Sequence, residues 1–221
     1  MGEMADYYTD YGSMGADAYG DYYNQPSLKE NDMPDKIKTP EFRGSYVNLV
    51  TPRKANEDAD PTYQMVIVLP KEDKATKAFL KKLNDQIDAV VLEKTGKKVP
   101  HKRLKHFPIK DGDSDWDDDQ FAGCWTISVS NKKRPGCIDK KQEVLADEEE
   151  LYSGAWYRVT VTAWCWSNKF GTGASINLHT VLKTRDDEPL GGGGNGNAEA
   201  DFADELEGGD ADEEDDDDYE V

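Results

Sequence analysis

The stretch that decides the fold is AWYRVTVTAWCWSN, residues 155–168, in which the character of the side chains alternates from one residue to the next. One set is aromatic, cationic or hydroxylated and comprises Trp156, Arg158, Thr160, Thr162, Trp164 and Trp166. The other set is mostly small and apolar and comprises Tyr157, Val159, Val161, Ala163 and Cys165. Because successive side chains of a strand point to opposite faces, this period of two predicts a β-strand with one face on a narrow core.

Four other segments rich in β-branched and aromatic residues predict further strands, namely 41–50, 63–70, 124–131 and 173–184. Pro70 ends the second of them, and TPRK (51–54) is interpreted as a turn after the first. GTGAS (171–175) and the glycines at 191–194 do not match a phosphate-binding loop between a strand and a helix. They are therefore interpreted as a turn and a linker.

The segment KATKAFLKKLNDQIDAVVLEK, residues 74–94, changes to a helical period. Its apolar residues recur at intervals of three and four: Phe79, Leu83, Ile87, Val90 and Val91. Asp73 is the expected N-cap, and Gly96 lies just past the expected end. The order strand, strand, helix and then three strands predicts a mainly β protein, a small barrel with one amphipathic helix, because a parallel sheet would need a helix at each crossover.

Charge divides the chain into parts. The net charge of −19 comes from its ends, since residues 1–35 contribute −7 and residues 199–221 contribute −14. The first segment lacks the aliphatic side chains of a core, which predicts a disordered leader, with base stacking or self-association of its tyrosines as alternatives. The predicted organisation is a leader (1–35), a folded domain (36–186), a Gly-rich linker (187–198) and a disordered acidic tail (199–221).

The sequence contains little evidence for a catalytic or metal-binding site. Three cysteines and three histidines are scattered without the pairs that zinc or iron–sulfur sites use, so no metal and no cofactor are expected. The carboxylates of DGDSDWDDD (111–119) lack the glycine and closing glutamate of a calcium loop, and a solvated acidic loop is favoured over a magnesium-dependent nuclease site. Without a nucleophile signature or an apolar run of membrane length, the sequence predicts an intracellular protein that is not an enzyme.

The aromatic and cationic face of residues 155–168 is the candidate binding site, since rings stack on bases and cations pair with phosphates. The residues expected to stack on bases are Trp164, Trp166, Trp156 and Trp125. The residues expected to contact phosphates are Arg158, Lys132, Lys133, Arg134 and Lys169, with PHKRLKHF (100–107) adding to a positive rim. The alternatives are that Trp164 and Trp166 are core residues between two sheets, and that the basic turn at 130–136 is only a solvated hairpin tip.

A polyanionic tail on a flexible linker can occupy such a basic groove itself, so that DNA must displace it. The displaced tail is then free to bind basic partner proteins through the residues Asp215, Asp216, Asp217, Asp218 and Tyr219. The alternative is a tail that only improves solubility.

The segment AWCWSNKFGTGASINLHTVLKTRD (163–186) resembles the phage single-stranded-DNA-binding proteins of replication and recombination. The shared pattern is an aromatic-x-Trp pair, an Asn and Gly-Ala-Ser leading into an alternating strand, and FPIKDGD (107–113) is similar to the family's entry to the strand near Gly123. The resemblance covers residues 36–186 and implies an OB-fold, a five-stranded Greek-key barrel, with Trp164 and Trp166 at base-stacking positions. It also implies an acidic C-terminal tail, although Tyr219 is third from the end here and the compared tails end on an aromatic residue.

The predicted function is therefore sequence-independent binding of single-stranded DNA, which the protein coats and protects in phage replication and recombination in the cytoplasm of the infected bacterial host. The expected partners are single-stranded DNA, duplex DNA more weakly, and replication or recombination proteins through the tail; a homodimer is left open. The rival functions are an acidic chaperone or DNA mimic that binds basic partners, and the nuclease. A DNA mimic should bind no DNA even without its tail, and a nuclease should degrade DNA with magnesium.

Overall fold

The computed structural model describes residues 35–54, 56, 57, 59–169 and 171–190. The predicted acidic tail and almost all of the predicted leader lie outside these residues, and so do Asp215, Asp216, Asp217, Asp218 and Tyr219. The elements are β1 (Ile37–Lys38), β2 (Phe42–Arg53), β3 (Thr62–Pro70), α3 (Lys74–Thr95), η2 (His101–Arg103), β4 (Ile109–Asp111), η3 (Asp119–Phe121), β5 (Cys124–Asn131), β6 (Gly136–Ile138), β7 (Trp156–Asn168) and β8 (Gly171–Arg185). Among the described helices, none combines the length and the apolar character that crossing a membrane requires.

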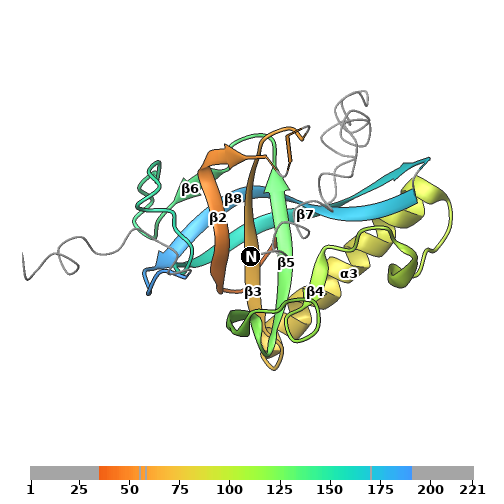
Figure 1. The fold of residues 1–221 in the computed structure, drawn as a ribbon, viewed down its shortest axis with the longest axis horizontal. Helices are drawn as coiled ribbons and strands as arrows, with labels where there is room; N and C mark the ends of the chain where they lie inside the picture. Colours follow the sequence, from red (N-terminus) through yellow and green to blue (C-terminus); the bar gives the residue numbers. More distant parts are fainter. Residues whose placement is uncertain (1–34, 55, 58, 170, 191–221) are drawn as a thin grey trace, which may run out of the picture. The chain divides into compact units, whose positions relative to one another are not determined.

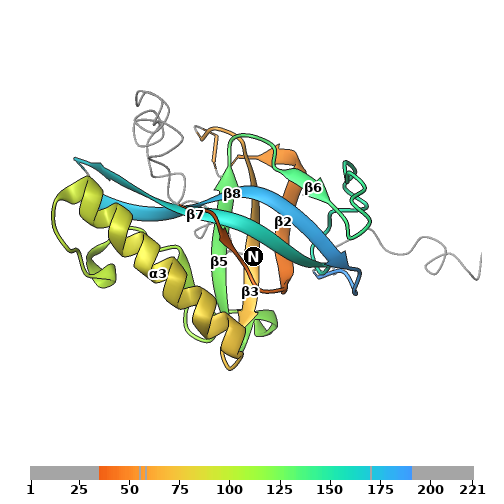
Figure 2. The ribbon, with the colours of Figure 1, turned by 180° about the vertical axis from the view of Figure 1, so that it is seen from behind.

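Five strands close into a ring, in which β2 pairs with β3, β3 with β5, β5 with β8, β8 with β7, and β7 with β2. All of these pairings are antiparallel except that between β5 and β8, where Ser130 lies opposite Asn177. The short strands β1, β4 and β6 extend the sheet beside β7, β5 and β8 (Figures 1 and 2). A closed five-stranded barrel with this order is an OB-fold, so the predicted fold class is confirmed.

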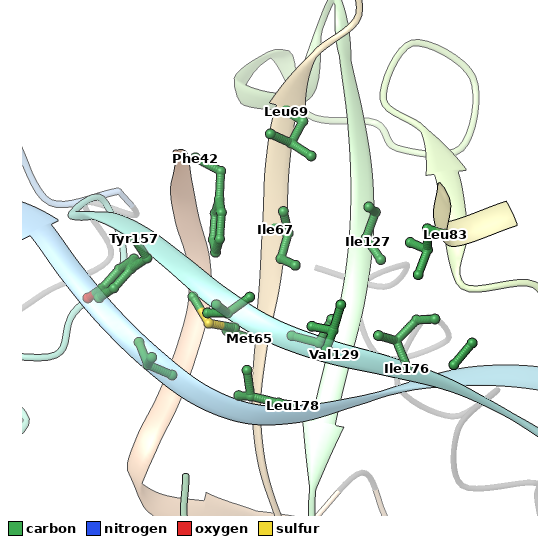
Figure 3. Close-up of a cluster of buried hydrophobic side chains, with 14 of the residues drawn as sticks. Phe42, Met65, Ile67, Leu69, Leu83, Ile127, Val129, Tyr157, Ile176 and Leu178 are labelled. Atoms are coloured by element: carbon green, nitrogen blue, oxygen red, sulfur yellow. The ribbon is translucent and has the colours of Figure 1, made fainter. Parts of the chain in front are cut away.

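Large apolar side chains from all five strands fill the barrel. Figure 3 shows Phe42 from β2, Ile67 from β3, Ile127 from β5, Tyr157 from β7 and Leu178 from β8, and none of the five has any exposed surface. This shared core joins residues that are up to 136 positions apart in the chain, from Phe42 to Leu178. Burial of each such side chain stabilises the fold by roughly 2 kcal/mol.

The alternation predicted for residues 155–168 is confirmed on its inner face, where the buried residues are Tyr157, Val159, Val161 and Ala163. The phenol O–H of Tyr157 donates to the backbone carbonyl of Tyr152 at 2.8 Å, so the polar atom of this buried ring is satisfied. Burial raises the pKa of Tyr157 well above its usual range. The strand β7 therefore turns its inner face to the core from Tyr157 to Ala163. Beyond that the predicted alternation fails, because Cys165 is only half-buried while Thr162 and Trp166 of the other face are buried.

The predicted helix is confirmed with its caps. The side chain of Asp73 accepts the backbone N–H of Ala75 at 3.1 Å, and Gly96 ends the helix in the left-handed region, with φ 70°. The apolar stripe of α3 packs against β7 (Figure 2). Gln86 fixes this contact, because its Oε1 accepts the backbone N–H of Ala163 at 2.7 Å.

Two predicted turns are wrong. Residues 51–53 continue β2, because Arg53 still pairs with Thr62 across the ladder to β3. GTGAS (171–175) belongs to β8, because it pairs with the end of β7 in an antiparallel hairpin. The glycine at 173 reflects close packing, since a Cβ there would lie 2.3 Å from Cζ2 of the Trp166 ring.

Residues 187–190, which composition assigns to the linker, are hydrogen-bonded to the barrel. The guanidinium of Arg43 donates to the carbonyl of Glu188 at 2.7 Å, and the backbone N–H of Leu190 donates to the carbonyl of Ser153 at 2.8 Å. The described domain therefore continues to Leu190.

Candidate nucleic-acid interface

A belt of uncharged polar side chains crosses the outer face of the barrel. Strand pairing brings together, in order, Thr162 of β7, Asn177 of β8, Ser130 of β5, Gln64 of β3 and Asn48 of β2. Each has a buried neighbour in the sequence that points into the core, so these side chains belong to the outer face, although Thr162 is only 7% exposed. We call these five residues the polar belt.

Three polar atoms on this face are buried without a hydrogen-bond partner in the described part of the chain. They are Nε2 of Gln64 in the belt, Oγ of Ser175 on β8 beside the belt, and Nε1 of Trp166 on β7. A buried polar atom left unpaired typically costs about 1–3 kcal/mol.

Trp164 lies beside the belt on the projecting part of the β7–β8 hairpin. It is opposite Ser175 and is half-buried. Trp166, two residues further, is only 6% exposed and its ring lies on Gly173. Of the predicted pair, Trp164 is thus placed to contact a ligand and Trp166 to hold the hairpin.

A second aromatic group lies over β2, β3 and β5 on the same outer side, and sequence reasoning missed it. The rings of Tyr46 and Trp116 stack with centroids 6.0 Å apart and planes 14° apart, and Phe121 is 4.4 Å from Trp116. The indole N–H of Trp116 donates to Oγ1 of Thr126 at 2.8 Å. Burial, and then the charge of Asp118, raise the pKa of Tyr46.

The placement of Tyr46 depends on a β-bulge in β2. The register with β3 shifts between Ser45 and Asn48, and Tyr46 adopts φ 48°. The only sequence signal for its partner was Trp116 itself, a large aromatic residue within a run of carboxylates.

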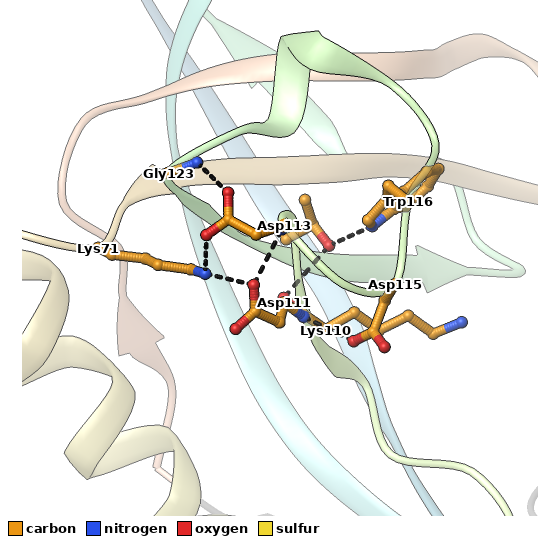
Figure 4. A network of polar contacts seen from close by, with 8 residues as sticks. Lys71, Lys110, Asp111, Asp113, Asp115, Trp116 and Gly123 are labelled. Carbon is orange, nitrogen blue, oxygen red and sulfur yellow. Dashed lines mark hydrogen bonds and ion pairs between the residues drawn. The ribbon is translucent and has the colours of Figure 1, made fainter.

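The acidic segment 111–119 is more structured than the predicted solvated loop. Lys71 pairs with Asp111 and, at 2.5 Å, with Asp113, whose other oxygen accepts the backbone N–H of Gly123 at 2.6 Å (Figure 4). The bond from Lys71 lowers the pKa of Asp111, and the N–H of Gly123 together with Lys71 lowers that of Asp113. These two carboxylates therefore fix the loop that carries Trp116.

Little in the described residues suggests catalysis. The three cysteines are free thiols, and burial raises the pKa of Cys137 and Cys165 to about 11, so neither is a ready nucleophile at neutral pH. Within the described residues, no group of three His, Cys, Asp or Glu side chains is placed to hold a metal ion.

The structure does not bring the other two predicted stacking residues to the belt. Trp125 lies on the same side of β5 as the core residue Ile127, and Lys71 is 5.0 Å above its ring. Trp156 is eight residues from Trp164, which corresponds to roughly 26 Å along a strand.

Trp156 is half-buried, as Trp164 is, and it contacts residues near the C-terminal end of the domain. The guanidinium carbon of Arg185 is 3.8 Å from the centre of its ring, and its N–H donates to Asp187 at 2.6 Å. Trp156 therefore helps to attach the C-terminal end of the domain.

The predicted phosphate contacts are spread over the surface. Arg158 is exposed on the outer side of β7, and Lys169 is exposed at the tip of the hairpin. Lys132 pairs with Asp60 at 2.5 Å, whereas Lys133 and Arg134 are exposed.

Strand pairing adds two cations that sequence reasoning missed on this side. Lys38 of β1 lies opposite Thr160, and Lys110 of β4 lies opposite Thr126. Cations therefore border the belt on both sides.

The comparisons with known proteins agree with this geometry. A family model described as the ssDNA-binding protein of Enterobacter phage Enc34 matches residues 35–220. The chain belongs to this family. Membership of the Enc34 family confirms the resemblance inferred from residues 163–186, and with it the prediction that the chain is not an enzyme.

Relatives of the Enc34 family chain are known from sequence and from structure. The putative protein p50 of Acyrthosiphon pisum secondary endosymbiont phage 1 is 30% identical over 167 residues, which are 72% of this chain and 88% of that protein. The single-stranded DNA-binding protein of bacteriophage Enc34, solved in complex with ssDNA, is 32% identical with a TM-score of 0.63, over 71% of this chain and 89% of that one. The T7 protein gp2.5 shares the fold, with 15% identity and a TM-score of 0.51 over 80% of this chain and 97% of that one.

Proposed function

We propose that this chain binds single-stranded DNA without reading its sequence, and that the outer face around the polar belt holds the strand. The observation that carries the proposal is the polar belt with aromatic rings at both of its sides. It is supported by the similarity of the fold to that of the Enc34 protein, which was solved in complex with ssDNA. Trp164 and the Tyr46–Trp116 pair offer rings for stacking, which every base accepts. We expect the phosphate contacts to come from Arg158, Lys132, Lys133, Arg134 and Lys169, and from Lys38 and Lys110 in addition.

The biological role follows from such binding. The protein coats and protects single strands during phage DNA replication and recombination, in the cytoplasm of the infected bacterial host. Residues 199–221, with fourteen acidic and no basic side chains, compete with DNA for the cationic surface and recruit replication proteins when displaced. Because phosphate contacts carry no preference for one strand over two, duplex DNA binds weakly at low salt.

The test is a salt titration of binding to a fluorescent oligothymidine, with tryptophan emission followed in parallel. The full chain is compared with a chain that ends at Leu190, which keeps the hydrogen bond to Ser153. Tighter binding by the shorter chain, quenched emission and a steep loss of affinity with salt are expected.

Other outcomes point to the rival functions. If neither chain binds DNA, the acidic segments act instead as a DNA mimic or chaperone for basic partners. If added magnesium leads to degradation of the oligothymidine, the chain is a nuclease.

A further inference from the structure

Two ends of the described domain carry opposite charge. The acidic end comprises residues 138–150, with six acidic and two basic side chains, and the basic end comprises residues 92–103, with five basic and one acidic. The net charges are therefore −4 and +4. In Figure 1 the strand β6, which leads into the acidic end, lies at the left, whereas the last turn of α3, which begins the basic end, lies at the right. Figure 2 shows the same separation from behind.

The acidic end presents apolar side chains as well as charge. Ile138 and Val144 form a backbone bridge and are 39% and 78% exposed. The loop between them is held in shape, because Asp139 accepts the backbone N–H of Glu143 at 2.9 Å. The exposed pair is therefore a fixed feature of this end.

The basic end has the complementary composition. Leu92 is 42% exposed, and in the described part of the chain the only other large apolar residues classed as exposed are Ile138 and Val144. The segment that follows α3 is fixed against the helix, because Nε2 of His101 is 2.8 Å from Oδ1 of Asp88. Its cations thus stay beside Leu92.

Apart from the contact between His101 and Asp88, the two ends have few partners of opposite charge within the described residues. Among those residues, no carboxylate lies within 4.0 Å of the basic side chains Lys94, Lys97, Lys98, Lys102 and Arg103. In the same part of the chain, no cation lies within that distance of the carboxylates of Glu143, Asp147, Glu148 and Glu149. One molecule cannot join ends that lie on opposite sides of it, but a second copy can.

We propose that the acidic end of one copy docks on the basic end of the next copy when both bind one DNA strand. Equal and opposite charge sets the orientation, and Ile138 and Val144 then meet Leu92. A contact between two different surfaces does not close on itself, so the copies form an open row along the strand. The docking goes beyond the proposed function but rests on it, because the shared strand supplies the high local concentration.

The test uses two charge-reversal variants of the full chain, K94E/K97E/K98E at the basic end and D147K/E148K/E149K at the acidic end, which change the net charges of these ends from +4 to −2 and from −4 to +2. The affinity for an oligothymidine just long enough for one copy measures binding to DNA without contacts between copies. Dividing the affinity for a long oligothymidine by this affinity gives a measure of cooperativity. Each variant alone is expected to lose on the order of tenfold in this ratio, since like charges then face each other.

An equimolar mixture of the two variants is the decisive sample. Each reversed end then meets an end of opposite charge on the other variant, so the mixture recovers the cooperativity that each variant lacks alone. A mixture no more cooperative than its components, or a wild-type chain without cooperativity, overturns the docking while binding to the short oligothymidine persists. Failure of the wild-type chain on both lengths would instead remove the proposed function, and the docking on DNA with it.

Discussion

The two ends of β7 carry the same kind of side chain on the same side of the strand, yet the surroundings differ. The ring of Trp156 lies under Arg185, and its N–H is bonded to Asp187. Trp164 lies opposite Ser175, beside the polar belt, and both tryptophans are half-buried. The alternation of a strand thus assigns a side chain to a face, whereas segments distant in the sequence decide which groups it contacts there.

The largest expected effect comes from disturbing the contact between Trp166 and Gly173 in the β7–β8 hairpin, near Trp164. In Gly173→Val the new side chain collides with the Trp166 ring, since even a Cβ would lie 2.3 Å from it, and stability should fall by about 3 kcal/mol in urea unfolding. Gly136→Ala is the matched control, because a Cβ there has no heavy atom within 4 Å. Equal stability of both variants would show that Trp166 does not need the space at Gly173.

The next largest effect is expected when Trp164 and Trp156 are each replaced by alanine and the two variants are compared. Trp164→Ala should weaken binding to an oligothymidine on the order of tenfold while the unfolding midpoint stays close to wild type, because a partly exposed stacking ring is lost. Trp156→Ala should leave the affinity nearly unchanged and lower the stability by about 1 kcal/mol, because it removes a cation–π contact and a hydrogen bond. The reverse pattern would place the binding surface at the Trp156 end.

A smaller effect is expected at the second aromatic group. Trp116→Phe keeps a ring over Tyr46 but removes the N–H that donates to Thr126, which should cost about 1 kcal/mol of stability with little loss of DNA affinity. Thr126→Val removes the other partner of the same bond. If the hydrogen bond is the cause, the double variant should be destabilised by less than the sum of the two single variants.

The smallest effect is a pH dependence at the belt. Burial, and then the charge of Lys36, lower the pKa of His179, whose ring bonds Thr162 at 2.8 Å. The folded state therefore binds this proton less readily than the unfolded state, so stability should fall as the pH drops through the ordinary histidine pKa of 6.5. His179→Gln should show a shallower decline between pH 7.5 and 5.5, and parallel declines would contradict the assignment.

Local patterns in the sequence were sufficient for much of the fold. The period of two in residues 155–168 and the period of three and four in residues 74–94 each report which face is buried, and burial dominates the energetics of both elements. Asp73 and Gly96 are local caps, so their positions also follow from the sequence alone. The order of these elements along the chain was enough to predict a small barrel with one helix.

The binding face depended on contacts that a linear pattern does not contain. The loop that carries Trp116 is fixed by Lys71, which is 40 residues before Asp111 in the chain. The ring of Trp166 packs on Gly173 of the neighbouring strand β8, and the ring of Trp156 contacts the guanidinium of Arg185. Composition could therefore identify aromatic candidates but could not show which groups each ring contacts.

The left-handed backbone of Tyr46 has a consequence for evolution and engineering. A residue with a side chain costs about 1 kcal/mol more than glycine in this conformation, so glycine or asparagine would relax the strand. A search for a more heat-resistant chain would therefore favour losing this tyrosine, whereas selection for a ring over Trp116 would favour keeping it. Higher thermal stability and higher ligand affinity thus favour different residues at position 46 of β2.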